Sequence, residues 1–312
     1  MTWKLILGLS AAIGAFAQSR LVSGVGNFIH DVGELDRSVH FYRDVLGMEM
    51  QRPPGDWQST EGVLKMYDAD GGKFRVANAQ IPGSPMRVEM VEFQGVDRKP
   101  VRRPWGTAGT SVLMLTVADL TPVLEQIKSA NAPVLVRSKK TCDGRALVVA
   151  DPDGFAVMMV EHAGQAAGSP PAKSNFTGMK FGYLVSGDAM AKGPFAALGL
   201  AAETRAHASC RSIEDALMSD AGTASIVTLP GGFEVWLAKG RPEKSEPAVR
   251  PHDPGAAVLR LMVSDVDAAV QALRQAQTNV VSAGGAIQTL PPGGLRATIL
   301  RAPDDLFIQV VK

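Results

Sequence analysis

The sequence predicts an α+β protein built from four βαβββ modules, which pair into two domains with open, cup-shaped mixed sheets. Its 312 residues suit two domains of ordinary size. Two stretches, 115–136 and 261–281, share the order strand, capped helix, strand. Each is followed by a strand, a tight turn and another strand, at 145–160 and at 296–310. This internal repeat indicates that one structural unit occurs more than once in the chain.

The helix of each repeat begins at an aspartate. Asp119 and Asp265 stand where a carboxylate accepts hydrogen bonds from the first free N–H groups of a helix. Apolar side chains then recur on one helical face, as at Leu120, Val123 and Ile127. The pattern therefore predicts two amphipathic helices, each packed against its own strands.

Two further units precede these repeats, one in each half of the chain. In the first, a strand at 27–31 leads into a helix at 34–47 that ends at a glycine. The remaining expected elements are strands at 63–67, 73–77 and 87–93 and, in the second half, a strand at 181–185, a helix at 190–198 and strands at 216–218, 225–229 and 233–237. A stretch rich in Ala, Gly, Pro and Ser separates the halves. We therefore expect domains at 22–163 and 177–312, joined by a linker at 164–176.

The first 17 residues predict a signal peptide, at 1–17. A basic start with Lys4 is followed by an apolar run from 5 to 17, which ends in Ala15-Phe16-Ala17. This small-x-small pattern is typical of a signal peptidase site and would leave Gln18 as the new N-terminus. The run is shorter than the ~20 apolar residues that span a membrane. We therefore expect an exported protein, periplasmic or secreted.

The composition narrows the range of partners. Hydrophobic residues make up 46% of the chain and the net charge is +1. Because there is no basic surplus to neutralise phosphates or anionic lipids, we expect neither nucleic acid nor a membrane as partner. The two cysteines, Cys142 and Cys210, fall one in each expected domain. An oxidising compartment would permit a disulfide, but two unpaired, small apolar residues are the favoured interpretation.

Residues 34–47, ELDRSVHFYRDVLG, closely resemble the first-helix signature of the vicinal-oxygen-chelate superfamily: glyoxalase I, bleomycin-resistance proteins, extradiol dioxygenases and methylmalonyl-CoA epimerase. Residues 145–161, around Asp151-Pro152-Asp153-Gly154, resemble its closing hairpin. In catalytic members two modules form a cup. Each lends a ligand from its first strand, usually His, seven residues before the acid that caps the helix, and one from its last strand, usually Glu. The resemblance implies that these ligands hold a divalent metal, which polarises a carbonyl or stabilises an enediolate.

These ligand positions carry few metal-binding side chains in this sequence. Module by module, they are occupied by Asn27 and Glu89, by Val112 and Met158, by Lys180 or Phe181 and Glu234, and by Val258 and Gln309. None is a histidine, and an amide or a thioether suits a hard divalent ion poorly. We therefore predict no metal site and no cofactor. The expected ligand-binding residues are Asn27, Glu89, Val112, Met158, Glu234, Val258 and Gln309, with Glu89 as the candidate catalytic base.

The five histidines do not restore a ligand set. His30 lies three residues from Asn27, and that odd offset places it on the opposite face of a strand. We expect the others to be ordinary surface or half-buried side chains: His40 on the first helix, His162 after a strand, and His207 and His252 in polar loops.

Three functions remain open. The first is an exported protein that binds a small organic molecule in an apolar cup without a catalytic metal. The second is an enzyme: a metal-dependent lyase, isomerase or dioxygenase with displaced ligands, or a metal-free acid–base enzyme that uses Glu89. The third is a non-catalytic interaction module. The apolar replacements Val112, Met158 and Val258 favour the first. Since four modules can build both cups in one chain, we expect a monomer, with other dimers as an alternative.

Overall fold

The computed structural model describes residues 21–80, 86–164, 175–187, 191–204, 212–218, 224–242 and 248–312. The predicted signal peptide, most of the predicted linker, His207 and Cys210 lie outside the described residues.

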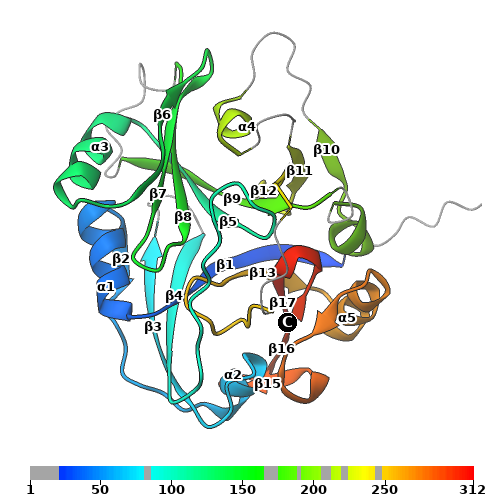
Figure 1. Ribbon diagram of the computed structural model, residues 1–312. Helices are drawn as coiled ribbons and strands as arrows, with labels where there is room; N and C mark the ends of the chain where they lie inside the picture. The colour runs from blue at the N-terminus through cyan, green and yellow to red at the C-terminus, as the bar shows by residue number, and fades with distance from the viewer. Residues whose placement is uncertain are drawn as a thin grey trace, which may run out of the picture.

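Four consecutive modules follow one another along the chain (Figure 1). The first contains β1 (Val22–Val32), α1 (Leu35–His40), a π-helical turn (Phe41–Val45), β2 (Glu49–Arg52), α2 (Glu61–Met66), β3 (Lys73–Gln80) and β4 (Arg87–Gln94). The second contains β5 (Ser111–Val117), α3 (Leu120–Ser129), β6 (Val134–Lys140), β7 (Gly144–Ala150) and β8 (Ala156–His162). The third contains β9 (Phe176–Val185), a π-helical turn (Ala191–Phe195), β10 (Ala202–Thr204), α4 (Ile213–Met218), β11 (Ser225–Thr228) and β12 (Glu234–Lys239). The fourth contains β13 (Ala257–Val263), α5 (Val266–Gln275), β14 (Asn279–Val280), β15 (Gln288–Leu290), β16 (Leu295–Arg301) and β17 (Phe307–Val311).

Two mixed sheets are built from these modules, and each sheet takes one module from each half of the chain. Sheet 1 has the order β14-β16-β17-β13-β1-β4-β3-β2, with β15 paired to β16, and so joins the first module to the fourth. Sheet 2 has the order β10-β11-β12-β9-β5-β8-β7-β6 and joins the second module to the third. The predicted α+β class with two mixed sheets is confirmed. The predicted halves, 22–163 and 177–312, are units of sequence, and each contributes one module to each sheet.

The helix caps form where the repeats predict them. The Asp119 carboxylate accepts a hydrogen bond from the backbone N–H of Thr121, and the Asp265 carboxylate accepts one from Ala268. A second carboxylate supports the first turn in two modules, because Glu92 accepts from the N–H of Leu35 and Glu161 from that of Leu120. Anionic oxygens at free helical N–H groups stabilise the helix start.

Two predicted strands are helices, and the error is the same in both modules. Residues 63–67 belong largely to α2, and residues 216–218 end α4. The second strands of these modules lie earlier, in β2 and β10. Short apolar runs suit either structure, and here buried side chains three and four residues apart place one helical face against the sheet.

The apolar side chains gather in three clusters. The largest lies between the two sheets and receives α1, α3 and α5. The other two cover the opposite faces of the sheets. We call the face of sheet 1 on which α2 packs cup 1, and the face of sheet 2 on which α4 packs cup 2. Among the described residues, no helix is long and apolar enough to span a membrane.

Candidate functional site

Cup 1 is lined at its centre by four adjacent strands, β4, β1, β13 and β17. Alternate side chains of each strand face the cup because strand side chains have a period of two. Ile29, Val91 and Val258 belong to the apolar cluster of this face. The polar residues that share their parity therefore point into the same cup.

Four polar side chains meet on this face, one from each strand. Asn27 Nδ2 donates to Glu89 Oε2 at 2.6 Å. The Arg260 guanidinium donates from Nη2 to Glu89 Oε1 at 3.0 Å, from Nη1 to Glu89 Oε2 at 3.2 Å and from Nε to Gln309 Oε1 at 2.6 Å. We call these four residues the cup 1 polar cluster. The structure thus brings together the predicted residues Asn27, Glu89 and Gln309.

Arg260 is the member that sequence reasoning missed. Val258, the predicted position on β13, is fully buried in the apolar cluster and makes no polar contact. Arg260 lies two residues further along the same strand face. A Cβ atom at Gly26 would come within 2.5 Å of Arg260 Cδ, so the glycine leaves room for the arginine stem. The sequence did contain a sign of this role, because Arg260 is a cation two residues after Val258 and therefore faces the same cup.

The ion pair controls the charge of Glu89. Burial alone would raise the pKa of Glu89, but the charge and hydrogen bonds of Arg260, together with the amide of Asn27, outweigh it and the pKa is lowered. Burial opposes the charge of Arg260 in the same way, and Glu89 reverses this so that the pKa of Arg260 is raised. Both groups are therefore charged at neutral pH. Their side chains are 16% and 22% exposed, which places the pair at the solvent-accessible edge of the cup.

The cup 1 polar cluster does not fit a divalent metal ion. It offers one carboxylate, two amides and no imidazole, and a guanidinium already occupies both carboxylate oxygens. A fixed positive charge within hydrogen-bond distance of the only anionic ligand opposes a second cation electrostatically. Hard divalent ions favour sets of oxygen ligands, and transition metals favour imidazole or thiolate.

Cup 2 carries a different polar group. Lys180 Nζ lies 3.4 Å from Glu234 Oε2 and 3.2 Å from Glu214 Oε1, and it stands 4.8 Å from the centre of the Trp236 ring. Trp236 Nε1 donates to Glu234 Oε2 at 2.9 Å. Lys180 therefore faces the cup, whereas the alternative, Phe181, lies in the cluster between the sheets. The cation again stands beside the predicted acid.

The remaining cup 2 positions are apolar, as predicted. Val112 and Met158 are fully buried in the cluster under α4, together with Met114. Met114 is directly paired with Met158 and with Lys180 on the neighbouring strands. Thioethers and aliphatic side chains provide no ligand for a hard metal ion. Among the predicted ligand positions of cup 2, only Glu234 therefore offers a carboxylate to a divalent metal.

His162 lies at the edge of cup 2 between two carboxylates. Its Nε2 is 3.3 Å from Glu214 Oε1 and its Nδ1 is 3.5 Å from Asp143 Oδ2. The hydrogen bond with Glu214 raises the pKa of His162. Burial would raise the pKa of Glu214, but His162 and Lys180 lower it to about 2. One ring nitrogen of His162 and one oxygen of each carboxylate lie within 4.8 Å of one another, so this group could also hold a metal ion.

His30 faces away from cup 1, as predicted. Its Nε2 lies 2.6 Å from Asp151 Oδ2 and its Nδ1 lies 3.2 Å from the carbonyl oxygen of Ala256. Burial would lower the pKa of His30, but the charge of Asp151 outweighs it and the pKa is raised. His252 differs from the expectation of a polar loop, because it is 3% exposed and its Nδ1 lies 2.8 Å from the carbonyl oxygen of Tyr67.

Cys142 is disulfide-bonded, so the favoured interpretation of two unpaired cysteines is wrong. The only other cysteine, Cys210, lies outside the described residues. Cys142 lies between β6 and β7 of sheet 2, and the described strands that precede and follow Cys210 in sequence, β10 and β11, belong to the same sheet. Their separation in sequence therefore does not place the two cysteines in different sheets, and it was not a sound reason to expect them to be unpaired.

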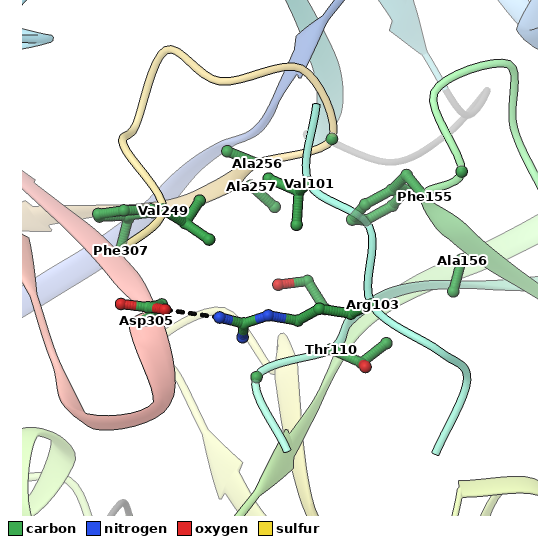
Figure 2. A pocket seen from close by; sticks show the side chains of 14 residues that line it. Val101, Arg103, Thr110, Phe155, Ala156, Val249, Ala256, Ala257, Asp305 and Phe307 are labelled. Carbon is green, nitrogen blue, oxygen red and sulfur yellow. Dashed lines mark hydrogen bonds and ion pairs between the residues drawn. The ribbon is translucent and has the colours of Figure 1, made fainter. Parts of the chain in front are cut away.

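A small pocket lies where β5 and β8 of sheet 2 and β13 and β17 of sheet 1 begin (Figure 2). Its volume is about 40 Å³, which suits a few water molecules. Arg103 crosses it and donates to Asp305 at 2.5 Å, and Phe155 and Phe307 form part of its wall (Figure 2). No predicted site residue lines this pocket.

Comparison with known proteins agrees with this fold. Residues 30–159 match the model of the Glyoxalase/Bleomycin resistance protein/Dioxygenase superfamily. The lactoylglutathione lyase of Haemophilus influenzae is 25% identical over 141 residues, which are 44% of this chain and 91% of that protein. Glyoxalase I from Zea mays superposes with a TM-score of 0.61 at 17% identity, over 93% of this chain and 92% of that one. Residues 30–159, which hold the first two modules, therefore resemble that superfamily in sequence, and the two mixed sheets have the fold of tandem glyoxalase-like domains.

Proposed function

We propose that this protein is exported and binds a small organic molecule in cup 1 without a catalytic metal. The observation that carries the proposal is the position of Arg260, whose guanidinium bridges the two predicted ligand positions Glu89 and Gln309. A cation fixed by the protein itself supplies the charge balance that a metal would otherwise give to Glu89. The apolar remainder of the cup then supplies contact area for an organic ligand.

The ion pair argues against Glu89 as a general base. A catalytic base works best when its pKa lies near the operating pH. The pKa of Glu89 is lowered, and both of its oxygens accept hydrogen bonds from Arg260. We infer that Glu89 anchors the polar edge of the cup and orients a ligand there.

Two further parts of the proposal rest on separate observations. The disulfide at Cys142 supports export, because disulfides persist in oxidising compartments. The predicted signal peptide supports the same compartment. Both sheets are completed by modules of one chain, which supports a monomer.

Elemental analysis and native mass spectrometry of the mature protein test the proposal together. We expect no stoichiometric divalent metal and, after a metabolite screen, a ligand that binds the wild type. Glu89→Gln is expected to weaken that binding, whereas Glu125→Gln, at an exposed site on α3, serves as the matched control. About one tightly bound metal per cup, removed by chelators with loss of an activity, would instead support a metal-dependent enzyme. The absence of any ligand from a broad screen would favour an interaction module.

A further inference from the structure

Among the described residues, three buried polar side chains of cup 1 have atoms without a hydrogen-bond partner. Both carboxyl oxygens of Asp31, the hydroxyl of Tyr67 and the side-chain oxygen of Asn78 are shielded from solvent and receive no hydrogen bond within the described part of the chain. Asp31 is 1% exposed and Tyr67 is 2% exposed. Native proteins satisfy nearly all buried polar groups, so several such atoms on one face point to a molecule that completes them.

The three groups are neighbours of the cup 1 polar cluster. Asn78 is directly paired with Glu89 on the adjacent strand. Asp31 lies two residues beyond Ile29, the partner of Glu89 on β1, and both face the cup. Two residues of a strand span about 7 Å. Asp31 therefore lies about 7 Å further along the sheet than the position of Glu89, a distance that a small organic molecule can bridge.

Aromatic side chains surround this end of the cup. Tyr67 follows α2, and its ring lies 4.9 Å from that of Phe93, which in turn lies 6.2 Å from that of Phe74. His252 holds the backbone of Tyr67 through its carbonyl oxygen. The position of the tyrosine is thereby fixed by the loop that follows the third module.

The unpartnered atoms favour one kind of ligand. Carboxylate and amide oxygens are acceptors, and a phenol oxygen accepts as well as donates. The complement of such a set is a group rich in N–H donors. Glu89 has a counter-ion in Arg260, whereas no cation of the described residues donates a hydrogen bond to Asp31. Arg98, whose charge acts on Asp31, donates its hydrogen bonds to the carbonyl oxygens of Val32 and Gly33.

We propose that cup 1 binds a small primary amine, with its ammonium group at Asp31 and its apolar body between the aromatic side chains and the Glu89–Arg260 pair. This inference rests on the proposed function and names the chemical class of its ligand. Aromatic faces attract an ammonium ion, and the carboxylate supplies its hydrogen-bonded counter-charge.

The electrostatics of the free protein agree with this assignment. Burial, and then the charges of Glu89 and Asp253, raise the pKa of Asp31 well above its usual range, and Arg98 offsets only part of the effect. Burial, followed by the charges of Asp31 and Glu89, raises the pKa of Tyr67. An ammonium ion at this place would stabilise the carboxylate and release the Asp31 proton to solvent.

A matched panel of probes tests the inference. Butylamine, hexylamine and 2-phenylethylamine are each compared with the alcohol of the same skeleton and, for the aromatic one, with phenylacetate. We expect at least one amine to raise the melting temperature and to bind at least tenfold more tightly than its alcohol in calorimetric titration. Asp31→Asn is expected to remove at least tenfold of that affinity, and Tyr67→Phe a smaller, severalfold share. Asp56→Asn, at an exposed site, is expected to change nothing.

The outcomes separate this inference from the proposed function. Circular dichroism establishes that each variant is folded before binding is compared. Amines that bind no better than their alcohols, or equally well to Asp31→Asn, would overturn the amine assignment. If alcohols or acids then bind, and Glu89→Gln weakens that binding, cup 1 is still a binding site, but for another class of small molecule. If nothing in the panel or a broad screen binds, both proposals fail.

Discussion

The Glu89–Arg260 pair offers a quantitative test of the idea that a guanidinium has taken over the charge balance of cup 1. Arg260→Met removes both hydrogen bonds to Glu89 and the one to Gln309. Loss of one partner of a fully buried pair costs about 3–5 kcal/mol, and loss at the surface costs at most about 1 kcal/mol. Because the side chains are 16% and 22% exposed, we expect a loss of about 2–3 kcal/mol in the free energy of unfolding.

Urea denaturation of a double-mutant cycle measures this coupling. Glu89→Gln should cost about 1–2 kcal/mol, and the double variant should recover at least about 1 kcal/mol relative to the sum of the single losses. Since the folded-state pKa of Glu89 is lowered, its stabilisation is complete above the unfolded pKa near 4.5 and is lost as the pH falls through the folded value. Glu89→Gln should abolish that part of the acid dependence. Losses no larger than those of the exposed control Arg137→Gln, or strictly additive effects, would refute the reasoning.

Three further predictions concern groups outside this pair. Reductant should lower the melting temperature of the wild type, with a loss of about 2–4 kcal/mol, and leave Cys142→Ser unchanged; equal responses would contradict a stabilising disulfide. The pKa of His30 is raised in the folded state, so its ion pair with Asp151 should stabilise the protein fully below pH ~6.5 and weaken as the pH rises through the folded pKa. His30→Gln should remove this pH dependence of the free energy of unfolding, as measured by denaturation across pH 6–9. Asp31→Asn should stabilise the free protein by about 1–3 kcal/mol at neutral pH, with a gain that vanishes in acid because the pKa of Asp31 is raised; an unchanged melting temperature would mean that the carboxyl is satisfied.

The modular repeat could be predicted from the sequence because helix caps and tight turns depend on residues that are close together in the chain. Asp119 and Asp265 cap their helices as expected, and the turn at 151–154 closes its hairpin. The helices at α2 and α4 were not predicted, since six-residue apolar segments fit a strand as well as one helical face. What decides between them is burial against a sheet formed by distant residues.

The pairing of the modules is not a local property. Both a consecutive pairing and the observed pairing of first with fourth satisfy the same strand patterns. In the structure β1 lies antiparallel to β13, with Ile29 opposite Val258, although more than two hundred residues separate them. For this reason the sequence could identify Asn27, Glu89 and Gln309 as candidate site residues but could not show that they share one cup.

Arg260 shows how that missing information affects chemistry. On β13 alone, Arg260 is an ordinary cation that faces the cup. Its role in the site depends on the ion pair with Glu89, which comes from the other half of the chain. A metal ion and a guanidinium both bring positive charge to a carboxylate, but the guanidinium is bound covalently to β13 and fixes the distance between the strands through a planar, bidentate contact. The Glu89–Arg260 pair therefore neutralises the charges at the edge of cup 1 and does not involve the polar groups of its interior. Asp31 lies further along the same face, and this separation is what leaves a charged ligand group a place to bind.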